Sequence, residues 1–231
     1  MSNEILKKII QVPFPENQYV VEETTKKQIY LHHTVSPQAD SLTDINYWKS
    51  NPERVATSII IQGDGTIYQL FSTKYYGYHL GLGNSEFSLY GLPYKSLDKI
   101  SIGVEIDSWG GLVKHTDNNW YPAKWDKNLK KLVPNTNCKF IPKEQVQEVP
   151  NGFRGFYAFQ KYTKEQIESL RQLLIYWNEK WGIPLTYRED IFDVDAEALK
   201  GIPGVYTHCS CRKDKSDIFP QQEMIDMLKS L

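Results

Sequence analysis

The chain is poor in cysteine and carries no surplus of either charge. Its 231 residues include three cysteines, Cys138, Cys209 and Cys211, and the formal net charge is −1. Cys209 and Cys211 lie too close in the sequence for an ordinary disulfide, so the cysteine content favours a reducing compartment. The balanced charge argues against a dedicated nucleic-acid-binding protein. A chain of this length buries enough apolar surface to fold without disulfide bonds.

Long hydrophobic runs are also missing. The segment from Met1 to Asn17 has one short apolar run, Ile9 to Phe14, which Pro13 interrupts. This segment does not have the pattern of a signal peptide, and no stretch is long enough to span a membrane. We therefore expect synthesis in the cytoplasm without a signal peptide, and no stable membrane insertion.

Four segments have the pattern of β-strands. Gln28 to His33 is the first, and Ala56 to Gln62 with Thr66 to Phe71 flank a glycine turn, which predicts a β-hairpin. In the fourth, Ser101 to Asp107, side chains alternate between two faces. Ile102, Val104 and Ile106 share one face, and Ser101, Gly103 and Glu105 share the other.

The clearest helix begins with the capping box Thr163-Lys164-Glu165-Gln166 and ends at Gly182 and Pro184. Shorter helices are predicted over 42–50, 190–199 and 221–231. Because strands and helices are interspersed, we expect an α/β fold with a mixed central β-sheet flanked by helices. An aromatic and aliphatic stripe of the long helix is more typical of a core than of a binding face: Ile167, Leu170, Leu174, Trp177 and Trp181.

Two polar segments lie outside these predicted strands and helices. Residues 1–26 are mixed and polar, which predicts an N-terminal arm before one domain over 27–231. Residues 108–152 have little periodicity, which predicts a long insertion, and such insertions are uncommon without a function. Its lysines indicate either a solvated loop or a contact surface for an anionic polymer: Lys124, Lys127, Lys130, Lys131, Lys139 and Lys143.

Histidines at two distant positions suggest one metal site. His32 and His33 are adjacent on a predicted strand, so their side chains point to opposite faces and only one enters a given pocket. Far along the chain, His208 precedes Lys215 and Asp217. Two histidines and an aspartate leave a zinc ion an open coordination position, as hydrolytic sites require. On chemistry alone, the thiolate of Cys209 or Cys211 competes with Asp217 as the third ligand.

A single carboxylate on an apolar strand suggests the proton acceptor. Glu105 lies on the polar face of its strand, and Gly103 leaves open space two residues earlier. Such a carboxylate is often only a surface or salt-bridged group. Beside a metal site, the same position suits a general base.

These segments together resemble the zinc-dependent N-acetylmuramoyl-L-alanine amidases of the phage-lysozyme and peptidoglycan-recognition-protein type. The resemblance extends from about Gln28 to Pro220 and rests on several blocks in the family order. The blocks are Ile29 to Thr34, the hairpin Asp64 to Leu70, Tyr78-His79-Leu80-Gly81, Ser101 to Ile106, the helix Tyr162 to Leu174, and His208 with Lys215-Ser216-Asp217.

The resemblance implies a zinc groove on one side of the sheet and peptidoglycan, with its N-acetylmuramic acid and stem peptide, as substrate. The reaction it implies is hydrolysis of the amide between N-acetylmuramic acid and L-alanine. His32, His208 and Asp217 would hold Zn²⁺. Glu105 would take the proton of the attacking water, and Lys215 would stabilise the oxyanion.

The resemblance also assigns substrate contacts and leaves departures. His79 would line the groove and contact substrate, or else be a packing histidine. Some members use a catalytic tyrosine at the position of Thr57. Here Thr57 would contact substrate instead, and the chain would rely on Glu105 for catalysis. The usual Asp-Pro-Gly that includes the third ligand is reduced here to Asp217-Ile218-Phe219-Pro220.

A zinc-stabilised structural module would prefer a closed four-ligand site that includes Cys209 and Cys211. Two other functions are favoured over it at this point. The first is a phage-type endolysin, monomeric, which would reach the wall through a holin or another route. The second is a non-catalytic peptidoglycan-binding or recognition protein. Substrate preference would be set within residues 108–152.

Overall fold

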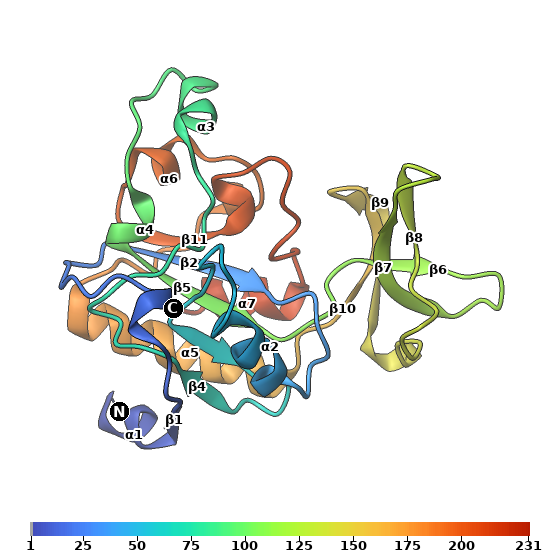
Figure 1. Ribbon diagram of the computed structural model, residues 1–231, viewed down its shortest axis with the longest axis horizontal. Helices are drawn as coiled ribbons and strands as arrows, with labels where there is room; N and C mark the ends of the chain where they lie inside the picture. Colours follow the sequence, from blue (N-terminus) through green and yellow to red (C-terminus); the bar gives the residue numbers. More distant parts are fainter. Residues whose placement is uncertain (1) are drawn as a thin grey trace.

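A mixed six-stranded sheet forms the centre of the computed structural model, which describes residues 2–231 (Figure 1). Strands β3 (Ile59–Ile61), β5 (Ser101–Ile106), β2 (Gln28–His33) and β11 (Gly204–Thr207) run parallel, with β11 at one edge of the sheet. Strand β4 (Ile67–Gln69) pairs antiparallel with β3 through the predicted hairpin. The family-like α/β architecture expected from the sequence is thereby confirmed. In spatial order the strands are β1 (Ile9–Gln11), β4 (Ile67–Gln69), β3 (Ile59–Ile61), β5 (Ser101–Ile106), β2 (Gln28–His33) and β11 (Gly204–Thr207).

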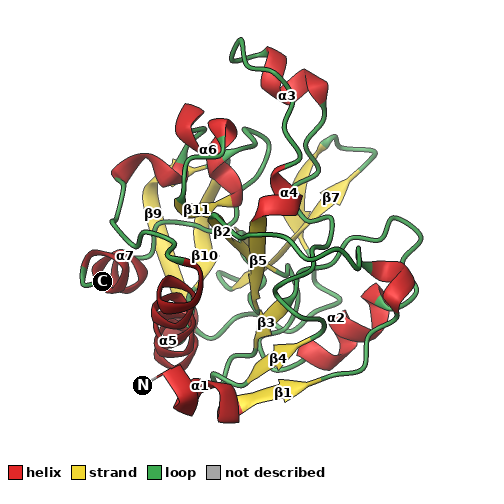
Figure 2. Cartoon of the chain, turned by 90° about the vertical axis from the view of Figure 1, so that its left-hand side faces the viewer, coloured by secondary structure: helices red, strands yellow, loops and turns green. Residues whose placement is uncertain are grey.

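One face of the sheet is covered by the long helix α5 (Lys164–Trp181), with α1 and α7 beside it (Figure 2). Thr163 caps this helix by accepting a hydrogen bond from the Gln166 amide, and Gly182 ends it in the left-handed conformation. Leu170 of α5 packs in the main core with Leu31 and Val104 of the strands. The predicted apolar stripe of α5 therefore faces the core.

The opposite face of the sheet carries polar side chains and the shorter elements. Here Ile45 of α2 packs with Ile60 of β3 in a second apolar cluster. Glu105 is paired with Ile60 of β3 and with His32 of β2. Because residues paired across neighbouring strands point to the same face of a sheet, all three side chains lie on this face. The other helices are α1 (Ser2–Lys8), α2 (Ser41–Trp48), α3 (Asn84–Ser88), α4 (Leu97–Ile100), α6 (Ala196–Lys200) and α7 (Gln222–Lys229). Short 3-10 helices are η1 (Glu16–Gln18), η2 (Lys143–Gln145), η3 (Glu189–Phe192) and η4 (His208–Ser210).

Residues 112–153 form a β-wing that projects to one side of the main body (Figure 1). Within the predicted insertion lies a three-stranded antiparallel sheet, followed by a β-hairpin, rather than an irregular loop. Leu112 and Ile141 of the wing pack with Ala158 in a small apolar cluster of their own. The strands of the wing are β6 (Leu112–Lys114), β7 (Trp120–Asp126), β8 (Lys131–Pro134) and β9 (Val146–Phe153). Strand β9 pairs with β10 (Phe156–Gln160), which follows the wing in the sequence.

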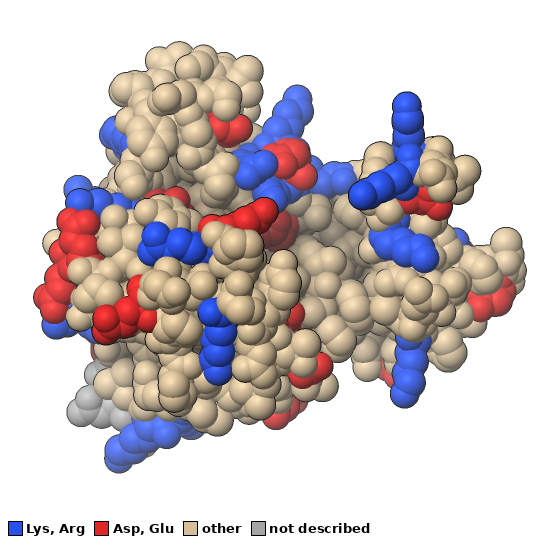
Figure 3. All heavy atoms as spheres, in the orientation of Figure 1, with Lys and Arg blue, Asp and Glu red and all other residues tan. Residues whose placement is uncertain are grey.

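The lysines of the β-wing are exposed, and several project from it in Figure 3. Lys114 stacks over the ring of Trp120, and Trp125 is 59% exposed. The exposed lysines are Lys114, Lys124, Lys127, Lys130, Lys131, Lys139 and Lys143.

Two expectations about secondary structure need correction. The N-terminal segment is not a separate arm, because β1 extends the central sheet by pairing in parallel with β4. The helix predicted over 190–199 is instead the short turn η3 followed by α6, which begins after the cap Asp195. Within residues 2–231, no helix combines the length and apolar character needed to cross a bilayer.

Candidate metal centre

Three side chains from two distant parts of the chain converge on one point. His32 is at the end of β2, and His208 follows β11, its parallel neighbour, so the sheet register places the two rings side by side. Asp217 lies on the loop after η4. Nδ1 of His32 lies 3.0 Å from Nδ1 of His208 and 3.1 Å from Oδ2 of Asp217, which lies 2.9 Å from Nδ1 of His208.

This triangle has the dimensions of a metal coordination shell. Ligands about 2.0 Å from a tetrahedral zinc ion lie about 3.3 Å from one another. His32, His208 and Asp217 are all buried, and their ligand atoms lie within 4.8 Å of one another. Two imidazole nitrogens and a carboxylate oxygen are also a donor set that zinc accepts, so the residues fit the ion that the resemblance implies.

The electrostatics of the triangle favour the forms that bind metal. Burial, with repulsion from His208, lowers the pKa of His32 to about 4, and Asp217 only partly offsets this. Burial opposes ionisation of Asp217, but His208 and His32 hold the pKa of its carboxyl well below its ordinary value. Neutral imidazole and ionised carboxylate are the states in which these groups ligate a cation.

Glu105 lies next to His32 on the same face of the sheet. The two residues are direct register partners on β5 and β2. Oε2 of Glu105 is buried and has no hydrogen-bond partner among the described residues. Burial raises the pKa of Glu105 well above its ordinary value, and Asp217 adds to this effect. A buried carboxylate oxygen without a partner leaves a place for a polar ligand at this position.

The triangle opens into a cavity of about 520 Å³ that Glu105 and Lys215 also line. His79 is part of the same wall, although its side chain is buried and its ring is bonded to His32. Sequence patterns did not point to several of the lining residues: Val35, Glu53, Val55 and Arg212. Arg212 donates to the Gly81 carbonyl and pairs with Asp214, so it closes one side of the cavity.

Two expected groups lie elsewhere. Thr57 is 1% exposed, its hydroxyl donates to the Ile59 carbonyl at 2.9 Å, and it does not line the cavity. This geometry does not support the expected substrate contact of Thr57. The thiols of Cys209 and Cys211 donate to the carbonyls of Lys215 and His208, away from the triangle. Burial raises the pKa of Cys209 to about 12, so this thiol stays protonated.

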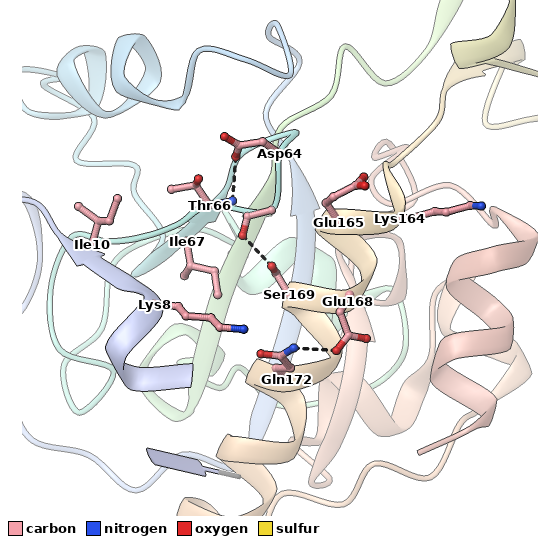
Figure 4. Close-up of a pocket in the computed structure, with 11 residues that line it drawn as sticks. Lys8, Ile10, Asp64, Thr66, Ile67, Lys164, Glu165, Glu168, Ser169 and Gln172 are labelled. Carbon is pink, nitrogen blue, oxygen red and sulfur yellow. Dashed lines mark hydrogen bonds between the residues drawn. The ribbon is translucent and has the colours of Figure 1, made fainter. Parts of the chain in front are cut away.

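A second hollow lies between the N-terminal segment and α5 (Figure 4). Ser169 donates to the Gly65 carbonyl at 2.6 Å across its floor. Glu168 is already bonded to Arg171 and Gln172. The three-ligand group found among the described residues, His32, His208 and Asp217, does not line this hollow. The hollow is therefore not a candidate metal centre.

Several solved structures share the fold of this chain. A mutant endolysin from Bacillus subtilis is 16% identical, with a TM-score of 0.51 and coverage of 96% of each chain. The catalytic domain of XlyA is 17% identical, with a TM-score of 0.51 and coverage of 96% of this chain and 97% of that one. The PlyG catalytic domain is 14% identical, with a TM-score of 0.52 and coverage of 96% and 93%. At these identities the likeness shows the fold.

The family comparison is independent of these structures. No curated protein sequence matches the chain. The family model of Amidase_2, described as N-acetylmuramoyl-L-alanine amidase, matches residues 23–221, which include the triangle, Glu105 and Lys215. This match covers most of the chain and supports a peptidoglycan amidase activity. The chain therefore belongs to the Amidase_2 family of N-acetylmuramoyl-L-alanine amidases.

Proposed function

We propose that this chain is a zinc-dependent amidase that cleaves the bond between N-acetylmuramic acid and L-alanine in peptidoglycan. The observation that carries the proposal is the buried triangle of His32, His208 and Asp217 beside Glu105. A zinc ion bound there would supply a Lewis acid for the scissile carbonyl and would lower the pKa of a water molecule. The remaining roles belong to side chains of this protein.

Glu105 would act as general base and then as general acid. Its buried Oε2 has no partner among the described residues, so it is free to accept the proton of the attacking water. The same carboxyl then delivers this proton to the nitrogen of L-alanine as the amide bond breaks. The proton thus moves from water to the leaving amine, and the new carboxylate stays on the lactyl group.

Lys215 would stabilise the charge that develops on the carbonyl oxygen. Its side chain is half-buried and lines the cavity. Burial raises the pKa of Glu105, and the charge of Lys215 offsets a small part of that rise. A fixed cation in a partly buried site stabilises an oxyanion more strongly than it would in water. Substrate would enter from the open side of the cavity, past Tyr78 and Val55.

The test is mass spectrometry of purified peptidoglycan after digestion by the zinc-loaded protein. We expect stem peptides with a new free L-alanine amine, formed with zinc and not after chelation. Intact glycan–peptide links would overturn the proposal, and binding to the wall without cleavage would favour the recognition-protein alternative.

We also propose a phage-type endolysin role, which the likeness in fold to solved endolysin domains supports. Expression in the bacterial cytoplasm should lyse cells only when a holin is produced as well. Lysis without a holin would contradict this route to the wall.

A further inference from the structure

The outer sides of both metal-binding histidines face one loop, Tyr78–Gly81. Each histidine directs Nδ1 to the metal triangle, which leaves its Nε2 pointing away from it. Nε2 of His32 lies 2.9 Å from Nδ1 of His79, and Nε2 of His208 lies 3.2 Å from the carbonyl oxygen of Leu80. Two consecutive residues of one loop therefore contact the two ligands on the side opposite the metal.

These contacts fix which nitrogen of each ligand carries the proton. The Leu80 carbonyl only accepts, so His208 must donate from Nε2 and keep Nδ1 free for the metal. His32 donates in the same way if Nδ1 of His79 is unprotonated. His79 then carries its proton on Nε2, which lies 2.9 Å from the hydroxyl oxygen of Ser101 and 3.7 Å from Asp98. In this arrangement His32 donates to His79, and His79 in turn donates from Nε2 toward Ser101, so each ring nitrogen has one defined role.

A buried carboxylate holds the loop in this position. Oδ1 of Asp98, on α4, accepts hydrogen bonds from the backbone amides of both His79 and Leu80, at 2.9 and 3.0 Å. These are the two residues that contact the metal histidines. One carboxylate oxygen thus positions both residues that contact the metal histidines, and the Asp98 side chain is only 14% exposed.

The sheet leaves room for the ring of His79 at one position. A Cβ atom on Gly103 of β5 would lie 2.9 Å from Cγ of His79 and 2.8 Å from Cγ2 of Thr57. Such a contact is far closer than van der Waals packing allows. The open space predicted beside Glu105 is thus filled by the His79 ring, which explains why the strand has glycine there.

We propose that His79 and Asp98 are positioning residues of the metal centre, with the Tyr78–Gly81 loop as its outer coordination layer. This role differs from the substrate contact expected for His79, and it rests on the proposed zinc site. Outer partners of this kind fix the tautomer and ring orientation of a ligand, and their loss weakens metal affinity about 10- to 100-fold.

The test measures zinc affinity by chelator competition, with far-UV circular dichroism and melting of the metal-free protein as controls of folding. His79→Phe keeps a ring but removes the acceptor, so zinc should bind about 10- to 100-fold more weakly. His79→Asn places an amide oxygen near the position of Nδ1, so it should restore most of the affinity. Asp98→Ala should weaken binding as well, and Asp98→Asn, which can still accept both amides, should restore it.

His115→Phe is the matched control. His115 is a histidine of the β-wing that contacts Asp117 and Tyr121 and does not line the cavity, so its loss should leave the zinc affinity unchanged. Wild-type affinity in folded His79→Phe and Asp98→Ala would overturn the inference, as would equal losses in the Phe and Asn variants of His79. If His79→Phe does not fold, the Asp98 pair decides. Absence of zinc binding by the unaltered protein would instead refute the proposed function.

Discussion

Replacing Glu105 by glutamine separates the chemistry of the site from its metal binding. The carboxylate lies beside His32 in the sheet register but is not one of the three triangle ligands. Glutamine has nearly the same shape and cannot accept a proton at neutral pH. We therefore expect Glu105→Gln to keep about one zinc ion per chain and to retain the fold.

The expected loss lies in turnover. A positioned general base contributes about 10²- to 10⁴-fold to the rate, which corresponds to about 2.7–5.5 kcal/mol in the activation free energy. Because Oε2 of Glu105 is buried without a hydrogen-bond partner among the described residues, no hydrogen-bonded neighbour shares its role as proton acceptor. The metal-free variant should be at least as stable as the unaltered protein, since burial already disfavours the charged form of Glu105.

The assay follows release of L-alanine-terminated peptides from purified peptidoglycan, together with zinc content and melting temperature. Glu179→Gln is a suitable control, because Glu179 is an exposed glutamate on α5, on the covered face of the sheet. Near-normal turnover of Glu105→Gln with zinc bound would refute the assignment of Glu105 as the base. Loss of zinc from this variant would show that Glu105 acts through the metal instead.

Three further predictions concern the metal and the pH dependence of stability. Asp217→Ala should abolish zinc loading in elemental analysis, whereas Cys211→Ala should not, and zinc retained by the Asp217 variant would contradict the ligand set. Chelation should abolish amide cleavage and added zinc should restore it; activity that survives complete zinc removal would exclude a metal-dependent reaction. Burial raises the pKa of Asp107 from 3.8 to about 8, so folding retains a proton that the unfolded chain releases. The free energy of unfolding should therefore fall as pH rises from about 4 to about 8, by at most about 1.4 kcal/mol per pH unit. Urea unfolding at several pH values measures this, and an equal pH dependence in Asp107→Asn would show that Asp107 is not its cause.

Local sequence signals predicted the regular elements well where each depended on short-range pattern. The capping box at Thr163 and the left-handed Gly182 bound α5 as expected, because both act within a single turn of helix. The alternation over Ser101 to Asp107 predicted which residues of β5 face the core. Two sets of strands were missed for different reasons. Strand β1 forms because the N-terminal segment reaches the distant strand β4. The β-wing strands pair with near neighbours in the chain, but their sequence has too little alternation to be recognised.

The ligand set was predicted from residue types, but its geometry was not. His32, His208 and Asp217 had the chemistry of a zinc site, and folding brought their ligand atoms within 4.8 Å. The competing cysteines could be set aside only once their thiols were seen to bond to backbone carbonyls. Spacing along the chain does not say where a sulfur atom points.

By itself, therefore, the sequence determined the α/β class, the long helix and the residue types of a candidate metal site, because periodicity, caps and ligand chemistry are local properties. The tertiary structure decided which of these residues meet. It buried Thr57 beneath the sheet surface, turned the ring of His79 toward His32, and placed Asp98 under the loop that contacts both histidines. Those contacts depend on the register of parallel strands and on loops that cross between them, and neither is encoded in any short stretch of sequence.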